Sequence, residues 1–203
     1  MGWYQYVMAA AYDPFMRRLE KDLKQYRQKL LSQTRGRVLE VGAGTGVNFD
    51  FYPKQAQVTA IEPSRAMFRK AKKRLAHPNI RLYNLGIEDD GLEALRPPGG
   101  FDFVVSMLVL CSVRDYPAAI ERYYKLMSDT GKLLVLEHIH ATGTAYGKFQ
   151  KWINPVWRPL ADGCNLTRRQ DLDLKKFFRP IEEGYFRLGA DWYWAVMEKK
   201  PGL

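Results

Sequence analysis

Three glycines at alternate positions and a glutamate further along the chain are the first residues whose spacing indicates chemistry. The glycines belong to the segment Glu40-Val41-Gly42-Ala43-Gly44-Thr45-Gly46. Glycine lets the backbone turn sharply and approach a ligand closely, and the start of a following helix presents free N–H groups. Glu62 comes about 20 residues later, where a carboxylate can accept hydrogen bonds from ribose hydroxyls. The spacing predicts a loop that binds a nucleoside-containing cofactor, and a plain turn with a solvated acid is the alternative.

Two candidate proton acceptors stand later in the chain. His138 ends an expected strand and can act as a general base near neutral pH, although a hydrogen-bonded structural histidine is the commoner case. Asp162 opens the unusual segment Asp162-Gly163-Cys164-Asn165-Leu166-Thr167-Arg168, whose simpler interpretation is a turn before a helix.

The two cysteines, Cys111 and Cys164, do not make a disulfide framework. They show no Cys-x-x-Cys spacing and no paired histidines, so we predict no metal site. Cys111 is most simply a small core residue. This use of cysteine favours a reducing, cytoplasmic location.

Alternating strands and helices must position these residues. We expect strands at 37–41, 57–61, 80–84, 101–106 and 132–137, with a turn at 129–131 before the last of them. Ser64 is expected to cap a helix, and Asp115 with Pro117 to start another that runs to about Met127. The alternation predicts a parallel sheet with helices on both faces. Residues 141–170 read as an irregular or helical insertion, and residues 181–198 as a closing hairpin.

Residues 1–35 are expected to form a helical region in front of a domain that spans residues 36–203. An aromatic lead, Trp3, Tyr4 and Tyr6, precedes a helix with alternating apolar and basic side chains. The net charge of +10 favours anionic partners such as nucleic acid, anionic lipid or acidic metabolites. The region is therefore either a segment on an anionic membrane surface or a lid with a solvated basic face. Because no stretch approaches about 18 apolar residues, we expect nothing to span the bilayer.

Four segments together resemble the motifs of one enzyme family. Val38–Gly46 is similar to the first motif of class I S-adenosylmethionine (SAM) dependent methyltransferases, and Ile61-Glu62-Pro63-Ser64 with Met67 to the second. Ile87-Glu88-Asp89 falls where that family contacts adenine, and Phe101–Ser106 resembles the strand whose end faces the transferred methyl group. The resemblance implies an α/β fold with a Rossmann-like, seven-stranded sheet whose last strand is antiparallel.

The same resemblance implies SAM as the cofactor and a set of contacts to it. Tyr12-Asp13 is similar to a Tyr-Asp segment in which the tyrosine closes over SAM, so Tyr12 is a candidate for both catalysis and cofactor binding. A packed tyrosine beside a helix N-cap is the alternative. The full set of implied cofactor contacts is Tyr12, Glu40, Gly42, Ala43, Gly44, Thr45, Gly46, Asn48, Glu62, Pro63, Ser64, Met67, Ile87, Glu88, Ser106, Met107 and Leu108.

A narrower resemblance concerns the methyl acceptor. Leu108–Val113, Leu136–Ile139 and Asp162–Arg168 are similar to the methyltransferase-like 7 proteins, which are microsomal alkyl thiol methyltransferases. This chain departs from them at its N-terminus, where a short aromatic and basic helix stands in place of a long apolar anchor. The resemblance implies a small or amphipathic acceptor, with a thiol first and the amine of phosphatidylethanolamine as the alternative. It also leads us to expect an acceptor pocket with walls formed by Leu108, Leu110, Trp157 and the loop 162–165. Quinone C-methylation is a further alternative.

Two other classes of function fit less well. An RNA methyltransferase that flips a base uses an Asn-Pro-Pro-Tyr type of motif, and Ser106-Met107-Leu108-Val109 occupies that place. Nucleic acid is therefore not expected as a partner. A binding module without catalysis is disfavoured by the intact glycines and Glu62.

Overall fold

The computed structural model describes residues 21–202 of the chain. Tyr12 and Asp13, together with the aromatic lead Trp3, Tyr4 and Tyr6, lie outside the described residues, so the roles expected for them remain predictions. The described chain starts in a helix that ends at Leu31 and agrees with the helix expected before the sheet.

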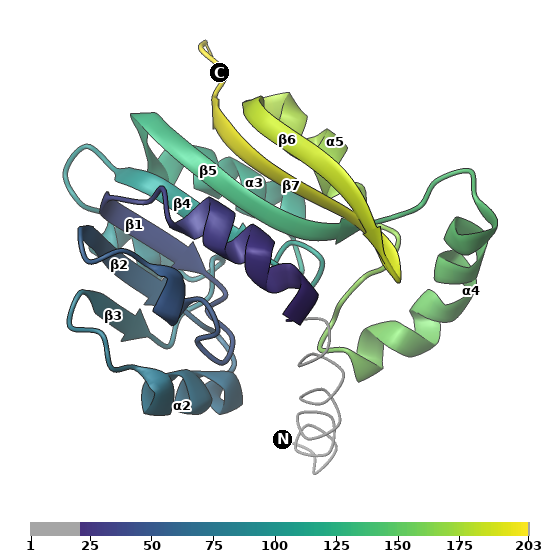
Figure 1. The fold of residues 1–203 in the computed structure, drawn as a ribbon, viewed down its shortest axis with the longest axis horizontal. Helices are drawn as coiled ribbons and strands as arrows, with labels where there is room; N and C mark the ends of the chain where they lie inside the picture. Colours follow the sequence, from purple (N-terminus) through teal and green to yellow (C-terminus); the bar gives the residue numbers. More distant parts are fainter. Residues whose placement is uncertain (1–20, 203) are drawn as a thin grey trace.

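Seven strands form a single sheet in the order β3-β2-β1-β4-β5-β7-β6 (Figure 1). They are β1 (Gly36–Val41), β2 (Ala56–Ile61), β3 (Ile80–Tyr83), β4 (Phe101–Met107), β5 (Met127–Ile139), β6 (Phe178–Leu188) and β7 (Ala190–Lys199). β1 pairs in parallel with β2 and β4, whereas β7 runs antiparallel to both β5 and β6. The predicted Rossmann-like sheet with an antiparallel last strand is confirmed. Its order reverses between β1 and β4, which is where such sheets bind ligands at the carboxyl ends of their strands.

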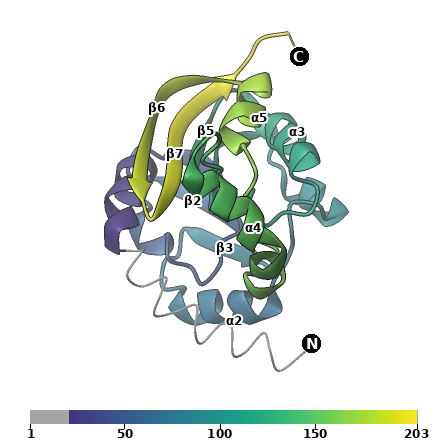
Figure 2. The same ribbon diagram turned by 90° about the vertical axis from the view of Figure 1, so that its right-hand side faces the viewer.

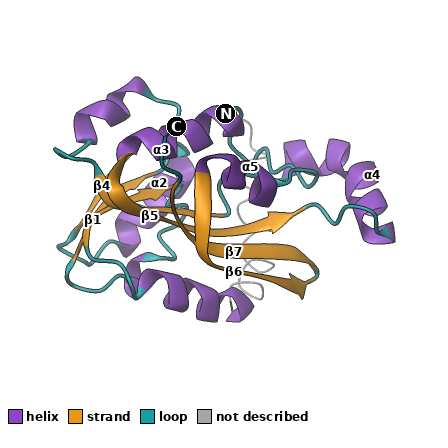
Figure 3. Ribbon diagram, turned by 90° about the horizontal axis from the view of Figure 1, so that it is seen from above, coloured by secondary structure: helices purple, strands orange, loops and turns teal. Residues whose placement is uncertain are grey.

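Helices cover both faces of the sheet (Figures 2 and 3). They are α2 (Arg65–Arg74), α3 (Tyr116–Leu126), α4 (Ala145–Leu160) and α5 (Gln170–Phe177), with short 3-10 helices η1 (Phe49–Phe51) and η2 (Asp90–Leu95). The side chain of Ser64 accepts a hydrogen bond from the backbone N–H of Met67, and Asp115 accepts one from Ala118. The expected cap at Ser64 and the expected helix start at Asp115 are therefore confirmed.

The core consists of two apolar clusters, one on each face of the sheet. On one face, Leu39 and Val104 belong to a cluster with Tyr123 of α3 and Leu174 of α5. On the other face the cluster includes Leu23, Leu30 and Leu31 of the first helix together with Ala71 of α2. Because both faces are covered, the central strands β1 and β4 are buried along most of their length.

β5 departs from its expected limits. The segment 129–131, predicted as a turn, lies within the strand. Phe101 pairs with Met127 and Phe103 with Lys132, so residues 128–131 bulge out of the ladder. Gly131 allows the close packing there, because a Cβ atom on it would lie 2.9 Å from the carbonyl oxygen of Phe101. The segment expected as a turn before the strand is thus an irregularity inside β5, with pairing to β4 on both sides of it.

The last third of the chain agrees with its expected organisation. The segment 141–170 contains α4, which stands away from the sheet (Figure 1). β6 and β7 form the closing hairpin, joined at Gly189 with φ +65°. Within residues 21–202, no helix combines the length and apolar character needed to cross a membrane.

Candidate active site

The glycine loop between β1 and η1 has left-handed backbone conformations at all three glycines. Gly42 has φ +67°, and a Cβ atom on it would lie 2.7 Å from Cγ2 of Val109, in the loop after β4. Gly44 has φ +58°, but a Cβ atom there would meet nothing within 4 Å. The loop is therefore packed closely against the β4 loop on one side and open at Gly44, where a ligand can approach the backbone.

Glu62 connects the glycine loop to the end of β2. Its Oε2 accepts a hydrogen bond of 2.8 Å from the backbone N–H of Gly44, and its Oε1 accepts one of 2.8 Å from Ser64. Burial raises the pKa of Glu62, while the two N–H groups act in the opposite direction. Each carboxylate oxygen keeps a second lone pair, so the side chain is held in place and can still accept a hydrogen bond from a ligand.

A series of buried, hydrogen-bonded side chains connects the first helix to the end of β1, next to the glycine loop. Arg27 of the first helix donates to Oδ1 of Asn48 at 2.6 Å, and Asn48 donates through Nδ2 to Oε1 of Glu40 at 2.7 Å. Burial raises the pKa of Glu40 to about 7, although Asn48 and Arg27 favour its ionised form. Sequence reasoning missed Arg27, because nothing local distinguishes it from the other basic side chains of its helix.

The residues expected at the adenine side lie around the ends of β2 and β3. Asn84 donates from Nδ2 to the backbone oxygens of Glu62 and Pro63, at 2.8 and 3.1 Å. Ile87 is buried in the core, and Oε1 of Glu88 accepts the backbone N–H of Asp115 at 2.9 Å. Met67 lies in the first turn of α2. Asn84 was not among the predicted site residues, yet it ties the two strand ends together.

The end of β4 contains a strained turn. Ser106 is fully buried and shares a hydrogen bond of 3.1 Å with the hydroxyl of Tyr123, so its side chain faces α3. Met107 contacts Arg27 through its sulfur at 3.8 Å. Leu108 has φ +62°, a left-handed conformation that is costly for a residue with a branched side chain. This turn directs the next two backbone N–H groups towards β5.

Glu137 receives those two N–H groups. Its Oε1 accepts hydrogen bonds from Val109 at 2.8 Å and from Leu110 at 2.9 Å, and the residue is fully buried. Burial raises the pKa of Glu137 to about 7 against the effect of these bonds. The carboxylate thus holds the β4 loop against the end of β5.

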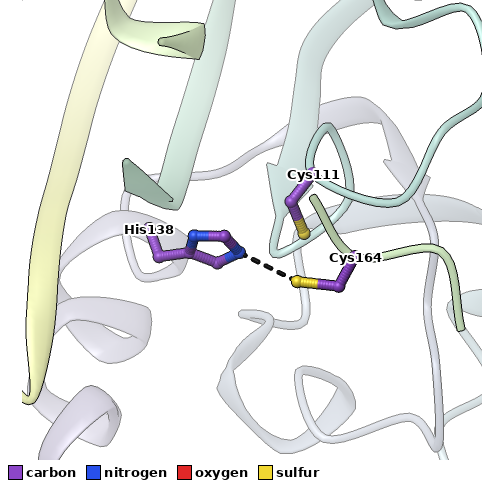
Figure 4. Close-up of side chains that lie close together, drawn as sticks. All are labelled: Cys111, His138 and Cys164. Atoms are coloured by element: carbon purple, nitrogen blue, oxygen red, sulfur yellow. Dashed lines mark hydrogen bonds between the residues drawn. The ribbon is translucent and has the colours of Figure 1, made fainter. Parts of the chain in front are cut away.

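Cys111, His138 and Cys164 meet beside this loop, and we call them the sulfur–imidazole cluster (Figure 4). Nε2 of His138 lies 3.1 Å from Sγ of Cys164, and all three donor atoms lie within 4.8 Å of one another. The hydrogen bond from Cys111, helped by His138, lowers the pKa of Cys164 to about 4. Burial lowers the pKa of His138, but its contacts with Cys164 raise it overall. The cluster therefore favours a thiolate beside an imidazolium. Sequence spacing had offered no signal for it.

The loop 162–165 is fastened to the β4 loop through the backbone. The N–H of Asn165 donates to the oxygen of Cys111 at 2.9 Å, and Arg168 donates to the backbone oxygens of Leu110 and Val113. Asp162 is exposed, and its charge contributes to the raised pKa of Glu62. The expected neighbourhood of the β4 loop, His138 and the loop 162–165 is therefore present, but Cys164 rather than Asp162 contacts His138.

A depression of about 450 Å³ lies elsewhere on the surface. It is lined by Ile139, His140, Ala141, Thr142, Arg169, Tyr185, Phe186, Arg187 and Asp191. None of the predicted site residues is among them, so this hollow is not the expected cofactor or acceptor site.

Comparison with known families agrees with this geometry. The profile of the methyltransferase domain family matches residues 15–174. The chain belongs to the methyltransferase family. The expected SAM-dependent methyltransferase, with SAM as its cofactor, is thereby confirmed.

The individual relatives of this methyltransferase differ in the share of its chain that their sequences match. Thiol S-methyltransferase TMT1B of Homo sapiens is 30% identical over 185 residues, which are 86% of this chain and 74% of that protein. Phosphatidylethanolamine N-methyltransferase of Cereibacter sphaeroides is 27% identical over 103 residues, 51% of each chain. The solved structure of N-methyltransferase NodS from Bradyrhizobium japonicum WM9, in complex with S-adenosyl-L-homocysteine, has a TM-score of 0.64 at 18% identity and covers 93% of this chain and 89% of that one. That likeness concerns the fold.

Proposed function

We propose that this methyltransferase transfers the methyl group of SAM to the sulfur of a thiol. The observation that carries the proposal is the similarity to thiol S-methyltransferase TMT1B across 86% of the chain. The similarity to phosphatidylethanolamine N-methyltransferase covers 51%, so a lipid amine is the second candidate acceptor.

The residues of the glycine loop fit SAM. The open side of Gly44 lets a ligand approach the backbone, and the buried carboxylate of Glu62 is held beside it. Glu62 would accept hydrogen bonds from the ribose hydroxyls, while Glu40 and Asn48 support the loop from beneath. Pro63, Ser64, Met67, Ile87 and Glu88 would surround the adenine side.

The chemistry of transfer depends mainly on alignment. Bound SAM supplies a methyl group on a sulfonium sulfur, which is already activated for displacement by a nucleophile. Holding two reactants in line can lower a barrier by about 7–11 kcal/mol. The strained turn at Leu108 and the N–H bonds of the next two residues to Glu137 fix the β4 loop, which packs against Gly42 of the glycine loop and would hold the acceptor beside it.

The acceptor must be a thiolate to act as the nucleophile. His138 is the described group best placed to favour that form, because it is 7% exposed at the end of β5 and its contacts with Cys164 raise its pKa. Asp162, the other expected proton acceptor, is exposed at the rim. Tyr12 would complete the site from outside the described residues.

We also propose that the protein works at an anionic membrane surface. On α4, four apolar side chains at intervals of three or four residues share one face, and Phe149, Trp152, Val156 and Leu160 are 51%, 74%, 57% and 40% exposed. The same helix exposes Lys148, Lys151 and Arg158. An apolar face flanked by cations, on a chain of net charge +10, suits the headgroup layer of anionic lipid.

An acceptor screen tests the catalytic proposal. SAM with an isotope-labelled methyl group is incubated with small thiols, phosphatidylethanolamine vesicles, a quinone and RNA, and products are identified by mass. We expect a thioether from soluble thiols without vesicles, at a rate that rises as the thiol ionises. Methylated phosphatidylethanolamine with no thioether in the same assay would overturn the thiol in favour of the lipid amine.

A further inference from the structure

The sulfur–imidazole cluster has the donor geometry of a metal site. Its three donor atoms come from three separate segments: the loop after β4, the end of β5 and the loop after α4. They all lie within 4.8 Å of one another. Around a tetrahedral zinc ion, ligand atoms at normal bond lengths are spaced roughly 3.5–3.8 Å apart. Small side-chain shifts would therefore bring the three atoms around one ion (Figure 4).

The donor types select the kind of ion. Two sulfurs and one imidazole nitrogen suit Zn²⁺ and other thiophilic metals, whereas Mg²⁺ and Ca²⁺ require oxygen ligands. Cys111 is 2% exposed and His138 is 7% exposed, so two of the ligands are shielded from water. Three protein ligands and one open position are the pattern of catalytic rather than structural zinc sites.

The backbone around the cluster is held before any ligand arrives. Arg168 bonds the oxygens of Leu110 and Val113 on either side of Cys111, and the N–H of Asn165 bonds the oxygen of Cys111 itself. His138 lies in the β5–β7 ladder opposite Trp192, whose ring meets the imidazole edge-on at 6.1 Å between centroids. Ligands on such fixed segments need little rearrangement to bind an ion.

We propose that Cys111, His138 and Cys164 bind a thiophilic divalent cation, with Zn²⁺ as the natural choice, and that its open position takes the acceptor sulfur. The second half rests on the thiol methyltransferase activity proposed above. The cluster is close to the cofactor loop, because Val109, two residues before Cys111, packs against Gly42. In this arrangement His138 is a ligand, and the cation takes over its part in favouring the thiolate.

The bonds of the step balance without a further reactant. The S–H bond of the acceptor breaks as its sulfur binds the cation, and the proton passes to water; a thiol that coordinates such a cation is deprotonated. The sulfur then bonds to the methyl carbon, and the bond between that carbon and the sulfonium sulfur breaks. Its electron pair stays on the sulfur of S-adenosylhomocysteine.

Metal binding is measured first without SAM or acceptor. The full chain, without a histidine tag, is stripped with chelator, and the uptake of Zn²⁺ and Co²⁺ is followed by elemental analysis and by the thiolate-to-Co²⁺ absorption band. We expect one ion per chain and at least a hundredfold weaker binding in Cys164→Ser and in His138→Gln. His77→Gln is the matched control, since His77 pairs with Asp50 far along the chain from the cluster. Melting curves check folding, and the half-buried Cys164 is the safer cysteine to replace.

Several outcomes decide between the proposals. Uptake below one ion per chain, or uptake that the variants do not change, would overturn the metal site. If the stripped enzyme methylates thiols at the full rate, the role of the cation in binding the acceptor sulfur fails and the thiol activity stands. If Zn²⁺ binds at the cluster but no thioether forms, the thiol activity fails and the metal site stands.

Discussion

Glu62 is the single side chain on which the cofactor site depends most directly. Its two oxygens accept hydrogen bonds from the backbone N–H groups of Gly44 and Ser64. One carboxylate therefore fixes both the glycine loop and the start of α2. An amide in its place has one acceptor oxygen instead of two, and it loses the charge that strengthens each bond.

We predict that Glu62→Gln weakens SAM binding by about 1.5–3 kcal/mol, which corresponds to roughly 10–150-fold in Kd. Calorimetric titration with SAM measures the change. Glu121→Gln, which alters an exposed glutamate of α3, serves as the control and should bind like the parent. If folded Glu62→Gln keeps the parental affinity, the ribose contact lies elsewhere.

Leu108 shows how strain at one residue serves the site. A left-handed φ of +62° costs a non-glycine residue about 1–3 kcal/mol. This conformation lets the N–H groups of Val109 and Leu110 both donate to Oε1 of the buried Glu137. Without them that oxygen would lack hydrogen-bond partners. The spacing of residues in the sequence did not predict this strained turn, because no glycine marks it.

At the scale of elements, α4 contributes no side chain to either apolar cluster of the described core. Its capping residue Thr144 accepts a hydrogen bond from Gly147 at 3.0 Å, which explains where the helix starts. Its exposed apolar face has no counterpart on α2 or α3, whose apolar side chains pack towards the sheet.

We predict that Phe149→Ala with Trp152→Ala reduces binding to vesicles that contain anionic lipid by roughly tenfold or more, because two large apolar side chains no longer enter the headgroup layer. Vesicle sedimentation of the full chain measures the effect, and high salt should weaken the parental binding. Leu172→Ala removes a side chain of α5 that is 52% exposed and should leave binding unchanged. Equal binding of the parent to anionic and neutral vesicles would rule out the membrane role.

At the scale of the whole molecule, the fold brings acidic groups together under the cofactor loop. Glu40 is buried beneath it with Arg27, Tyr52 and Glu62 as charged or ionisable neighbours. Burial raises its pKa from 4.5 to about 7, so the folded chain keeps a proton that the unfolded chain releases. The contribution of Glu40 to the free energy of unfolding is therefore fully present below about pH 4.5 and is lost as the pH rises to about 7.

We predict that Glu40→Gln has a flatter pH dependence of stability than the parent. The amide that replaces the carboxyl group cannot ionise, so relative to pH 5 the variant should keep up to about 3 kcal/mol more of its free energy of unfolding at pH 8. Urea denaturation at both pH values measures this difference, and the Glu121→Gln control should follow the parent. Identical pH dependence in all three proteins would show that Glu40 ionises normally in the folded chain.

The sequence by itself determined the features that depend on neighbouring residues. The helix caps at Ser64 and Asp115, the glycine loop and the hairpin at Gly189 each rest on residues a few positions apart, where side-chain and backbone chemistry act directly. The sheet followed from the alternation of strands and helices together with the family motifs. The segment 129–131, expected as a turn before the strand, instead lies inside β5 as a bulge, because Met127 and Lys132 on its two sides both pair with β4.

Only the tertiary structure decided which distant residues share a site. Arg27 reaches Asn48 across 21 positions, and His138 reaches Cys164 across 26. Neither separation along the sequence matches the spacing of a known motif. The sequence therefore indicated only a basic surface helix and two unrelated cysteines. The strand order sends the loops after β1, β4 and β5 to the same edge of the sheet, and this convergence, which no local pattern encodes, creates the sulfur–imidazole cluster beside the cofactor loop.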